Sequence, residues 1–138
     1  MADKSLKSLA SMMRKLDFCM MTTRDGRGSY HSRPMSNNGE VEYEGDSYFF
    51  TWEESTKVKN INEHPMVSLA FQGNDMLFIH VNGEASLIHQ RARMEPYWNK
   101  ELERWFPEGL DTPGVVMIKV SAKHIKYWHK EDEGEITL

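Results

Sequence analysis

A succession of short strand-like runs, each closed by turn residues, constrains this fold more than any other feature. Between residues 18 and 128, apolar or alternating runs follow one another at short intervals. Segments such as Asp25-Gly26-Arg27-Gly28 and Gln72-Gly73-Asn74-Asp75 separate them, and residues of these types favour turns. The pattern predicts an antiparallel sheet or barrel. The predicted strands are 18–23, 29–36, 41–43, 47–51, 66–71, 76–81, 84–88, 115–120 and 124–128.

Strands this numerous need their edges protected. In a chain of 138 residues the edges must close into a barrel or be covered by a partner. Asn82-Gly83 favours a two-residue hairpin turn between two of the strands. We therefore predict one domain, residues 1–138, with a mainly β (α+β) fold: a small antiparallel β-barrel with peripheral helices.

Three helices are predicted beside the strands. Apolar positions at helical spacing mark residues 4–16, Ser55 begins a helix that Pro65 ends, and residues 91–105 carry an apolar face. The acidic segment 130–135 is expected to be loosely ordered. The apolar face of the last helix consists of Met94, Trp98, Leu102 and Trp105.

Charge and cysteine usage argue against several classes of function. The 17 basic residues are scattered among 21 acidic ones, so a net charge of −4 without a basic stripe predicts no nucleic-acid partner. No apolar run has the length of a membrane span, and the first residues lack the apolar core of a secretory signal. The single cysteine, Cys19, fits a reducing compartment, so we expect a cytoplasmic protein. The histidines never fall at the i, i+4 spacing of zinc ligands, and no metal site is predicted.

The segment from Phe50 to Lys57 is the strongest candidate for a binding site. An apolar strand runs into a polar turn, Ser55 is placed to cap the next helix, and Lys57 falls in its first turn. Free N–H groups, a partial positive charge and a lysine together suit a phosphate. The alternative is an ordinary capped helix with an exposed lysine, since Glu53 and Glu54 place negative charge nearby.

Arg33-Pro34-Met35 adds a second piece near the end of a strand. Alone, its arginine is most simply a surface residue at a strand end. Taken with Lys57, it supplies a second cation for one phosphate, while the backbone beside it and the aromatics of Phe50-Thr51-Trp52 border a flat apolar slot. Flavin mononucleotide (FMN) needs this combination, because its phosphate seeks charge and its tricyclic ring seeks apolar walls with backbone hydrogen bonds.

Taken in order, these motifs resemble the flavin-binding split-barrel proteins of the pyridoxamine 5′-phosphate oxidase superfamily, and most closely the bacterial general stress protein subgroup. The resemblance covers nearly the whole chain and rests on the order and spacing of motifs that are each short. It implies a split β-barrel. The matching segments are Met20-Met21-Thr22-Thr23, residues 28–35, residues 49–71, Gly83-Glu84-Ala85, Trp105-Phe106-Pro107-Glu108-Gly109 and Ile125-Lys126-Tyr127-Trp128.

The resemblance also implies which residues hold the flavin. Arg33 and Lys57 would bind its phosphate together with Ser55 and Thr56. The cofactor would be FMN, with FAD as the alternative. The wall and backbone contacts of the ring would come from Pro34, Met35, Phe50 and Thr51.

In this family the flavin lies at the interface of a homodimer. The resemblance therefore implies a homodimer here, with Trp105, Phe106 and Trp128 as candidates to approach the flavin from the second subunit. Core or dimer packing is the alternative role for these three aromatics.

Two departures limit what the resemblance implies. Pyridoxamine phosphate oxidases continue from the motif matched by Tyr127-Trp128 into an Arg-x-His segment that grips substrate, and no counterpart follows here, so true pyridoxamine phosphate oxidase activity is not expected. A basic residue that the family carries after its arginine motif is replaced within Ser36-Asn37-Asn38.

The expected function is that of an FMN-dependent oxidoreductase of unknown substrate, with no catalytic acid or base assigned. A non-catalytic flavin carrier or stress-response protein is the alternative. A haem-handling split barrel is a third option, although no histidine stands out as an axial ligand.

Overall fold

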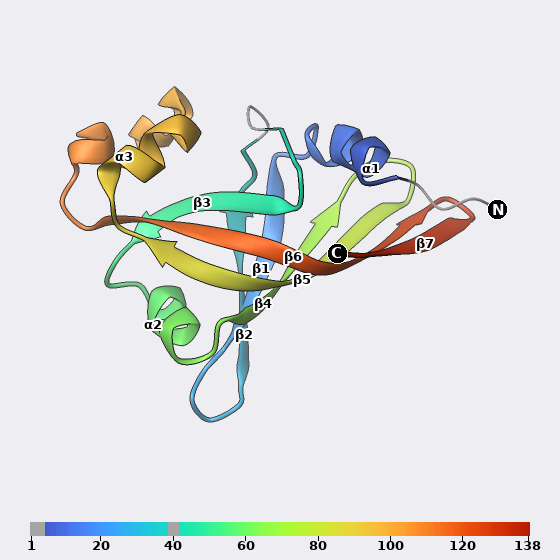
Figure 1. Cartoon of the computed structure of the whole chain (residues 1–138), viewed down its shortest axis with the longest axis horizontal. Helices are drawn as coiled ribbons and strands as arrows, with labels where there is room; N and C mark the ends of the chain where they lie inside the picture. Colours follow the sequence, from blue (N-terminus) through green and yellow to red (C-terminus); the bar gives the residue numbers. More distant parts are fainter. Residues whose placement is uncertain (1–4, 39–41) are drawn as a thin grey trace.

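The computed structural model describes residues 5–38 and 42–138. Within them, one antiparallel sheet of seven strands has the order β2-β1-β4-β5-β6-β3, and β7 pairs with β6. Figure 1 shows the sheet curling into a half-barrel with short helices at its margins, which confirms the predicted split barrel. The strands are β1 (Phe18–Arg24), β2 (Tyr30–Ser36), β3 (Asp46–Trp52), β4 (Met66–Gln72), β5 (Leu77–Ile88), β6 (Val115–His129) and β7 (Asp132–Thr137).

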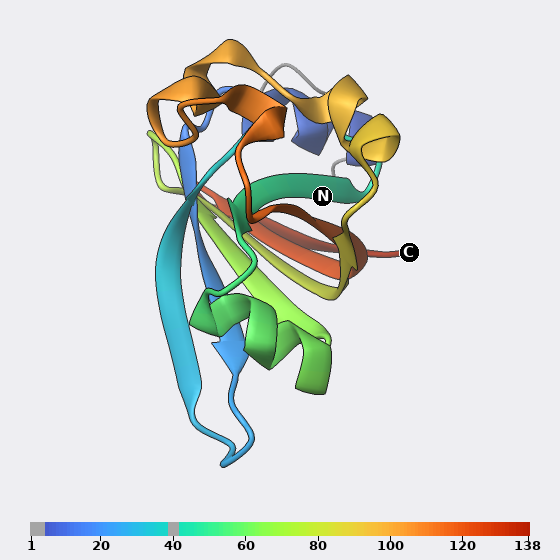
Figure 2. The same ribbon diagram turned by 90° about the vertical axis from the view of Figure 1, so that its left-hand side faces the viewer.

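Short helices lie on two sides of β3. Figure 2 shows the segment 91–111 on one side of this strand and α2 on the other. None of the helices in the described ranges is long and apolar enough to cross a membrane. The α-helices are α1 (Leu6–Met13), α2 (Thr56–Glu63) and α3 (Arg91–Met94), and the 3-10 turns are η1 (Glu95–Tyr97), η2 (Lys100–Arg104) and η3 (Gly109–Asp111).

The continuous helix predicted over residues 91–105 is wrong. α3 ends after four residues, and Trp98 then adopts an extended conformation before η2 begins. Pro96 explains the break, because proline lacks an N–H and its ring clashes with the preceding helical turn. Trp98 still packs on the apolar cluster under this segment, whereas Trp105 is 57% exposed.

The hairpin predicted at Asn82-Gly83 is also wrong. β5 runs without a turn through both residues, and the register with β6 shifts between them, from Asn82 opposite His124 to Gly83 opposite Ala122. This is a β-bulge, the other structure that glycine favours within a strand. A Cβ on Gly83 would lie 2.7 Å from the carbonyl oxygen of Ser121, so glycine lets the two backbones approach closely.

Three further expectations about strands need correction. The runs 115–120 and 124–128 form the single strand β6, which pairs with β5 along one edge. Along its other edge, the first part of β6 pairs with β3 and the last part pairs with β7. The segment 130–135 is ordered, since β7 begins within it. Of the strand predicted at 41–43, Val41 lies outside the described residues, and Glu42 and Tyr43 are not in a strand.

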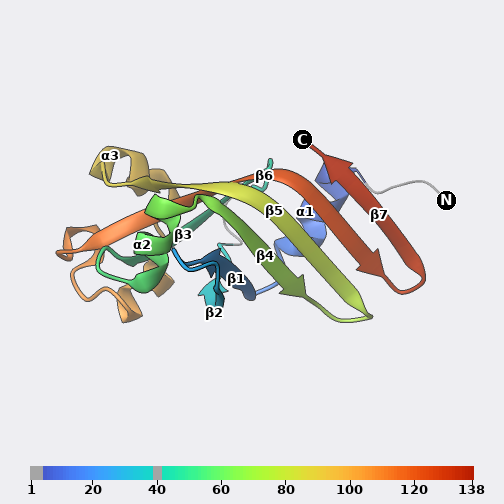
Figure 3. The ribbon, with the colours of Figure 1, turned by 90° about the horizontal axis from the view of Figure 1, so that it is seen from below.

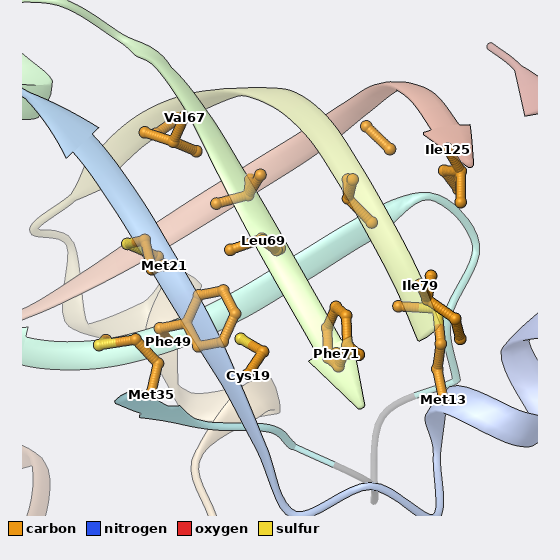
Figure 4. Packing of buried hydrophobic residues seen from close by; sticks show 14 of the residues in the cluster. Met13, Cys19, Met21, Met35, Phe49, Val67, Leu69, Phe71, Ile79 and Ile125 are labelled. Carbon is orange, nitrogen blue, oxygen red and sulfur yellow. The ribbon is translucent and has the colours of Figure 1, made fainter. Parts of the chain in front are cut away.

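The core fills the concave side of the half-barrel. Alternate residues of the strands point inward, and Figure 4 shows Cys19, Met21, Leu69, Phe71 and Ile79 gathered there. α1 closes this side with Leu9 and Met13. Burial raises the pKa of the Cys19 thiol to about 12, which disfavours the reactive thiolate.

Candidate functional site

Two cations from different elements meet beside the start of α2. Arg33 on β2 donates a hydrogen bond to Thr23 Oγ1 at 2.8 Å and a longer one to the Met21 carbonyl at 3.3 Å. Lys57 Nζ donates to Thr51 Oγ1 at 3.0 Å. Burial, and then the nearby charge of Arg33, lower the pKa of Lys57, and burial lowers the pKa of Arg33. The two side chains are therefore close, partly desolvated and mutually repelling.

Ser55 occupies the N-cap position of α2 but does not cap the helix with its side chain. Its hydroxyl oxygen is buried and has no hydrogen-bond partner. The predicted side-chain cap is therefore wrong, and the first N–H groups of the helix keep their capacity to bind a ligand. We call this site the cationic corner. It consists of Arg33, Ser55 and the first two residues of α2, Thr56 and Lys57. A phosphate fits it, because phosphate oxygens accept from cations, from N–H groups and from the orphan hydroxyl.

A buried hydrogen-bond network behind the corner was not anticipated from the sequence. Thr23 Oγ1 accepts from Arg33 and also from Asn60 Nδ2, the latter at 3.0 Å. Thr23 and Asn60 are 1% and 2% exposed. Asn60 lies beside Ile61 on the buried side of α2. A polar residue among buried apolar ones was the one feature of the sequence that could have indicated a buried hydrogen bond here. The network fixes the guanidinium of Arg33.

An apolar cavity of about 290 Å³ opens next to the corner. Thr51 joins the two, because it lines the cavity while its hydroxyl accepts from Lys57. Phe18, Ser36 and Phe49 were not anticipated as lining residues. The full lining is Phe18, Pro34, Met35, Ser36, Phe49, Phe50, Thr51, Trp52, Trp105 and Phe106.

The two aromatics of the 105–106 pair reach this cavity from their own chain. Phe106 is 3% exposed and packs against Trp52, with ring centroids 4.8 Å apart, while Trp105 stays largely exposed at the rim. Within one chain they already line the cavity, and their approach to a flavin from a second subunit stays a prediction. Trp128 does not line it. This residue lies near the end of β6, opposite Phe78 of β5 and Glu133 of β7.

Titratable side chains are absent from the apolar cavity: none of its ten lining residues is an acid, a histidine, a lysine or a cysteine. No group of three or more His, Cys, Asp or Glu within residues 5–38 and 42–138 is placed to hold a metal ion. The arrangement can hold a flat apolar ring with a phosphate at one end. Among the described residues that line the apolar cavity, none offers a side-chain acid or base to the ring.

The fold and this site define a class of protein: a split barrel with a cationic corner at the start of a helix and an apolar cavity against its third strand. The model of one family, described as "Pyridoxamine 5'-phosphate oxidase like", matches residues 4–138. The chain belongs to this family.

Individual relatives are distant in sequence. Protein bli-3 of Neurospora crassa is 27% identical over 146 residues, covering 97% of this chain and 70% of that protein. A Clostridium acetobutylicum protein, described as related to general stress protein 26 of the pyridoxinephosphate oxidase family, has a TM-score of 0.83 at 16% identity, with 99% and 97% of the two chains covered. The general stress FMN/FAD binding protein of Xanthomonas citri has a TM-score of 0.72 at 24% identity, covering 96% and 90%. The two solved structures establish a shared fold.

Proposed function

We propose that this protein binds FMN, with the phosphate in the cationic corner and the ring in the apolar cavity. The observation that carries the proposal is the pair Arg33 and Lys57, which form no ion pair with a carboxylate in the part of the chain that the structure describes. Partly desolvated cations without an anion are costly, and a phosphate dianion would compensate both. It would also give the orphan hydroxyl of Ser55 a partner.

Family membership and the name of the Xanthomonas citri relative support the same cofactor. That name includes both FMN and FAD, and FAD is the alternative here, with its FMN half in the site and the adenosine outside. When bound, the flavin supplies the hydride and electron chemistry. The chain's own residues would hold the phosphate and keep water from the ring with Trp52 and Phe106.

Two functions follow from a bound flavin. An FMN-dependent oxidoreductase is the first, with the protein contributing position and exclusion of water. A flavin carrier or stress-response protein is the second, and the lack of an acid or base in the apolar cavity favours it. Anaerobic mixing with NADH and NADPH discriminates: bleaching of the flavin absorbance at a useful rate supports the oxidoreductase, and flavin that stays oxidised supports the carrier.

We also propose that the protein is a homodimer formed through the convex side of the sheet. Figure 3 shows β4, β5 and β6 side by side there, with α1 behind them. Large apolar side chains are exposed on this side: Phe18 at 61%, Met66 at 54% and Phe78 at 36%. Phe18 also lines the apolar cavity, so a second copy on this face would adjoin the cavity and bring its own Trp128 toward it.

Chromatography of the cofactor tests the binding proposal. Acid release from the purified protein should give FMN, and flavin-free protein should bind added FMN with quenching of flavin fluorescence. A protein that neither carries nor takes up flavin would overturn the proposal.

Light scattering tests the dimer. Phe78→Glu should yield a monomer, because a charge would be buried in the apolar interface, whereas Met76→Glu in the β4–β5 turn changes an equally apolar exposed residue and should leave a dimer. A monomeric wild-type protein at micromolar concentration would exclude this assembly.

A further inference from the structure

A second cavity of about 290 Å³ adjoins the apolar cavity. The two share Phe18, Ser36, Phe49, Phe50 and Trp105 as lining residues. A molecule in the second cavity would therefore reach the edge of whatever occupies the first. We call the second one the amide cavity, after its three asparagines.

The asparagines of the amide cavity are held in place by hydrogen bonds. Asn37, a lining residue, donates both of its Nδ2 protons to the carbonyls of Met13 and Leu16, each at 2.8 Å, so its amide oxygen is the group that can accept. Asn99 Oδ1 accepts from the backbone N–H of Glu101 at 2.9 Å, so its Nδ2 is the group that can donate. A fixed acceptor and a donor suit a carboxamide, which carries both functions.

Asn38 ties the two walls of this cavity together. Its Nδ2 donates to the Tyr97 carbonyl at 2.8 Å, and its Oδ1 accepts a long hydrogen bond from Asn99 at 3.5 Å. The end of β2 and the η1–η2 segment are thus connected across the cavity. Its polar groups are preorganised, which lowers the cost of binding a ligand.

The amide cavity carries a charge opposite to that of the cationic corner. One cation, Arg104, and two carboxylates, Asp17 and Glu101, are found among its described lining residues, and +1 with −2 gives −1. The guanidinium of Arg104 lies over the ring of Trp105, 5.9 Å from its centroid. A phosphate ester or carboxylate would meet net repulsion here, while an uncharged ligand would not.

We propose that the amide cavity is the substrate subsite of this protein and takes a small, uncharged aromatic carboxamide, the class to which the ring of nicotinamide belongs. The ring would lie against Trp105, and the carboxamide would pair with Asn37 and Asn99. This inference rests on the proposed function for its role as a substrate subsite, but binding of the ligand can be measured without flavin.

Nicotinamide and nicotinate form a matched pair of probes, because they share one ring and differ only in that the first carries a carboxamide and the second a carboxylate. Titrated into FMN-loaded protein, nicotinamide should perturb the flavin absorbance and quench the Trp105 fluorescence, and nicotinate should bind at least about fivefold more weakly. The quenching should be lost in Trp105→Phe. Equal affinity for the two probes would overturn the charge argument.

Two double variants, one of them a control, test whether the preference for nicotinamide over nicotinate arises in this cavity. Asp17→Asn with Glu101→Gln should bring nicotinate to within about twofold of nicotinamide, because the repelling charges are gone. The control, Glu131→Gln in the β6–β7 turn with Asp132→Asn at the start of β7, makes the same change in net charge and should leave the preference unaltered. Retention of the preference in the first double variant would contradict the proposal.

Glu101→Trp places a large side chain at an exposed position of the lining and should abolish nicotinamide binding while the protein stays folded. Nicotinamide binding that survives this change would overturn the assignment of the subsite. The titration of flavin-free protein, followed by Trp105 fluorescence, keeps the two proposals separate. Failure to bind FMN rejects the proposed function, whereas failure to bind nicotinamide in the flavin-free or the loaded protein rejects the subsite.

Discussion

Lys57 and Thr51 connect the two halves of the candidate site, with Nζ of the lysine 3.0 Å from Oγ1 of the threonine. Thr51 is the next-to-last residue of β3 and lines the apolar cavity, whereas Lys57 is the second residue of α2 and belongs to the cationic corner. Only a three-residue connection, residues 53–55, separates the strand from the helix. A strand followed at once by a helix start therefore holds the cationic corner close to the apolar cavity, where we propose that the phosphate and the ring lie.

Removing both cations should weaken FMN binding strongly. Arg33→Ala with Lys57→Ala deletes two charge-assisted contacts, each of about 1.5–3 kcal/mol, so flavin affinity should fall by about 3–6 kcal/mol. Fluorescence titration with FMN measures the loss. Lys59→Ala, an exposed lysine on the same helix, is the control and should bind as the unaltered protein does. Normal FMN affinity in the double variant would exclude the phosphate assignment.

Ser55→Ala should separate cofactor binding from helix stability. An N-cap serine that bonds the helix normally contributes about 1 kcal/mol, but the Ser55 hydroxyl makes no such bond. We expect unfolding by urea to be unchanged within about 0.5 kcal/mol, while FMN affinity falls by about 1 kcal/mol for the lost phosphate contact.

Ser5→Ala provides the opposite pattern as a control. Ser5 accepts a hydrogen bond from the N–H of Ser8 at 3.1 Å and caps α1. Its loss should cost about 1 kcal/mol of stability without any effect on FMN binding. A large destabilisation by Ser55→Ala would show that the hydroxyl has a structural partner after all.

Gly83→Ala should destabilise the fold through the bulge in β5. The added Cβ would lie 2.7 Å from the Ser121 carbonyl oxygen and 2.8 Å from a methyl of Val120. Overpacking of this kind costs about 1–3 kcal/mol. Gly26→Ala is the matched control, since its Cβ would meet only a flexible Glu63 carboxylate at 3.4 Å. Urea midpoints that move equally in both variants would rule out the close approach as the cause.

The sequence predicted most strand positions because alternation and turn residues are local signals. β1, β3 and β4 each begin and end within one residue of the predicted bounds. Asn82-Gly83 shows the limit of such signals, because the dipeptide suits a hairpin turn and a bulge equally well in isolation. Pairing with β6, about forty residues later in the chain, decides between them, and no local pattern contains that information.

The same distinction between local and long-range information applies to the candidate site. The sequence identified Arg33 and Lys57, because they carry charge and stand at a strand end or after a turn. The structure brings the two side chains together. The contact between Thr23 and Asn60 joins residues 37 positions apart, and both look unremarkable in their own segments. A buried hydrogen bond of this kind depends on the fold having formed, so it became visible only in the structure.

FMN affinity should fall as pH rises through the alkaline range. In the free protein, burial and the charge of Arg33 lower the pKa of Lys57 below its ordinary value of 10.5. A bound phosphate dianion favours the charged lysine and raises that pKa, so binding takes up a proton and weakens once the pH exceeds the lowered value. Titrations with FMN at increasing pH should show this loss. Lys57→Arg keeps its charge throughout the range and should remove most of the dependence. An identical alkaline loss in Lys57→Arg would show that another group titrates at the site.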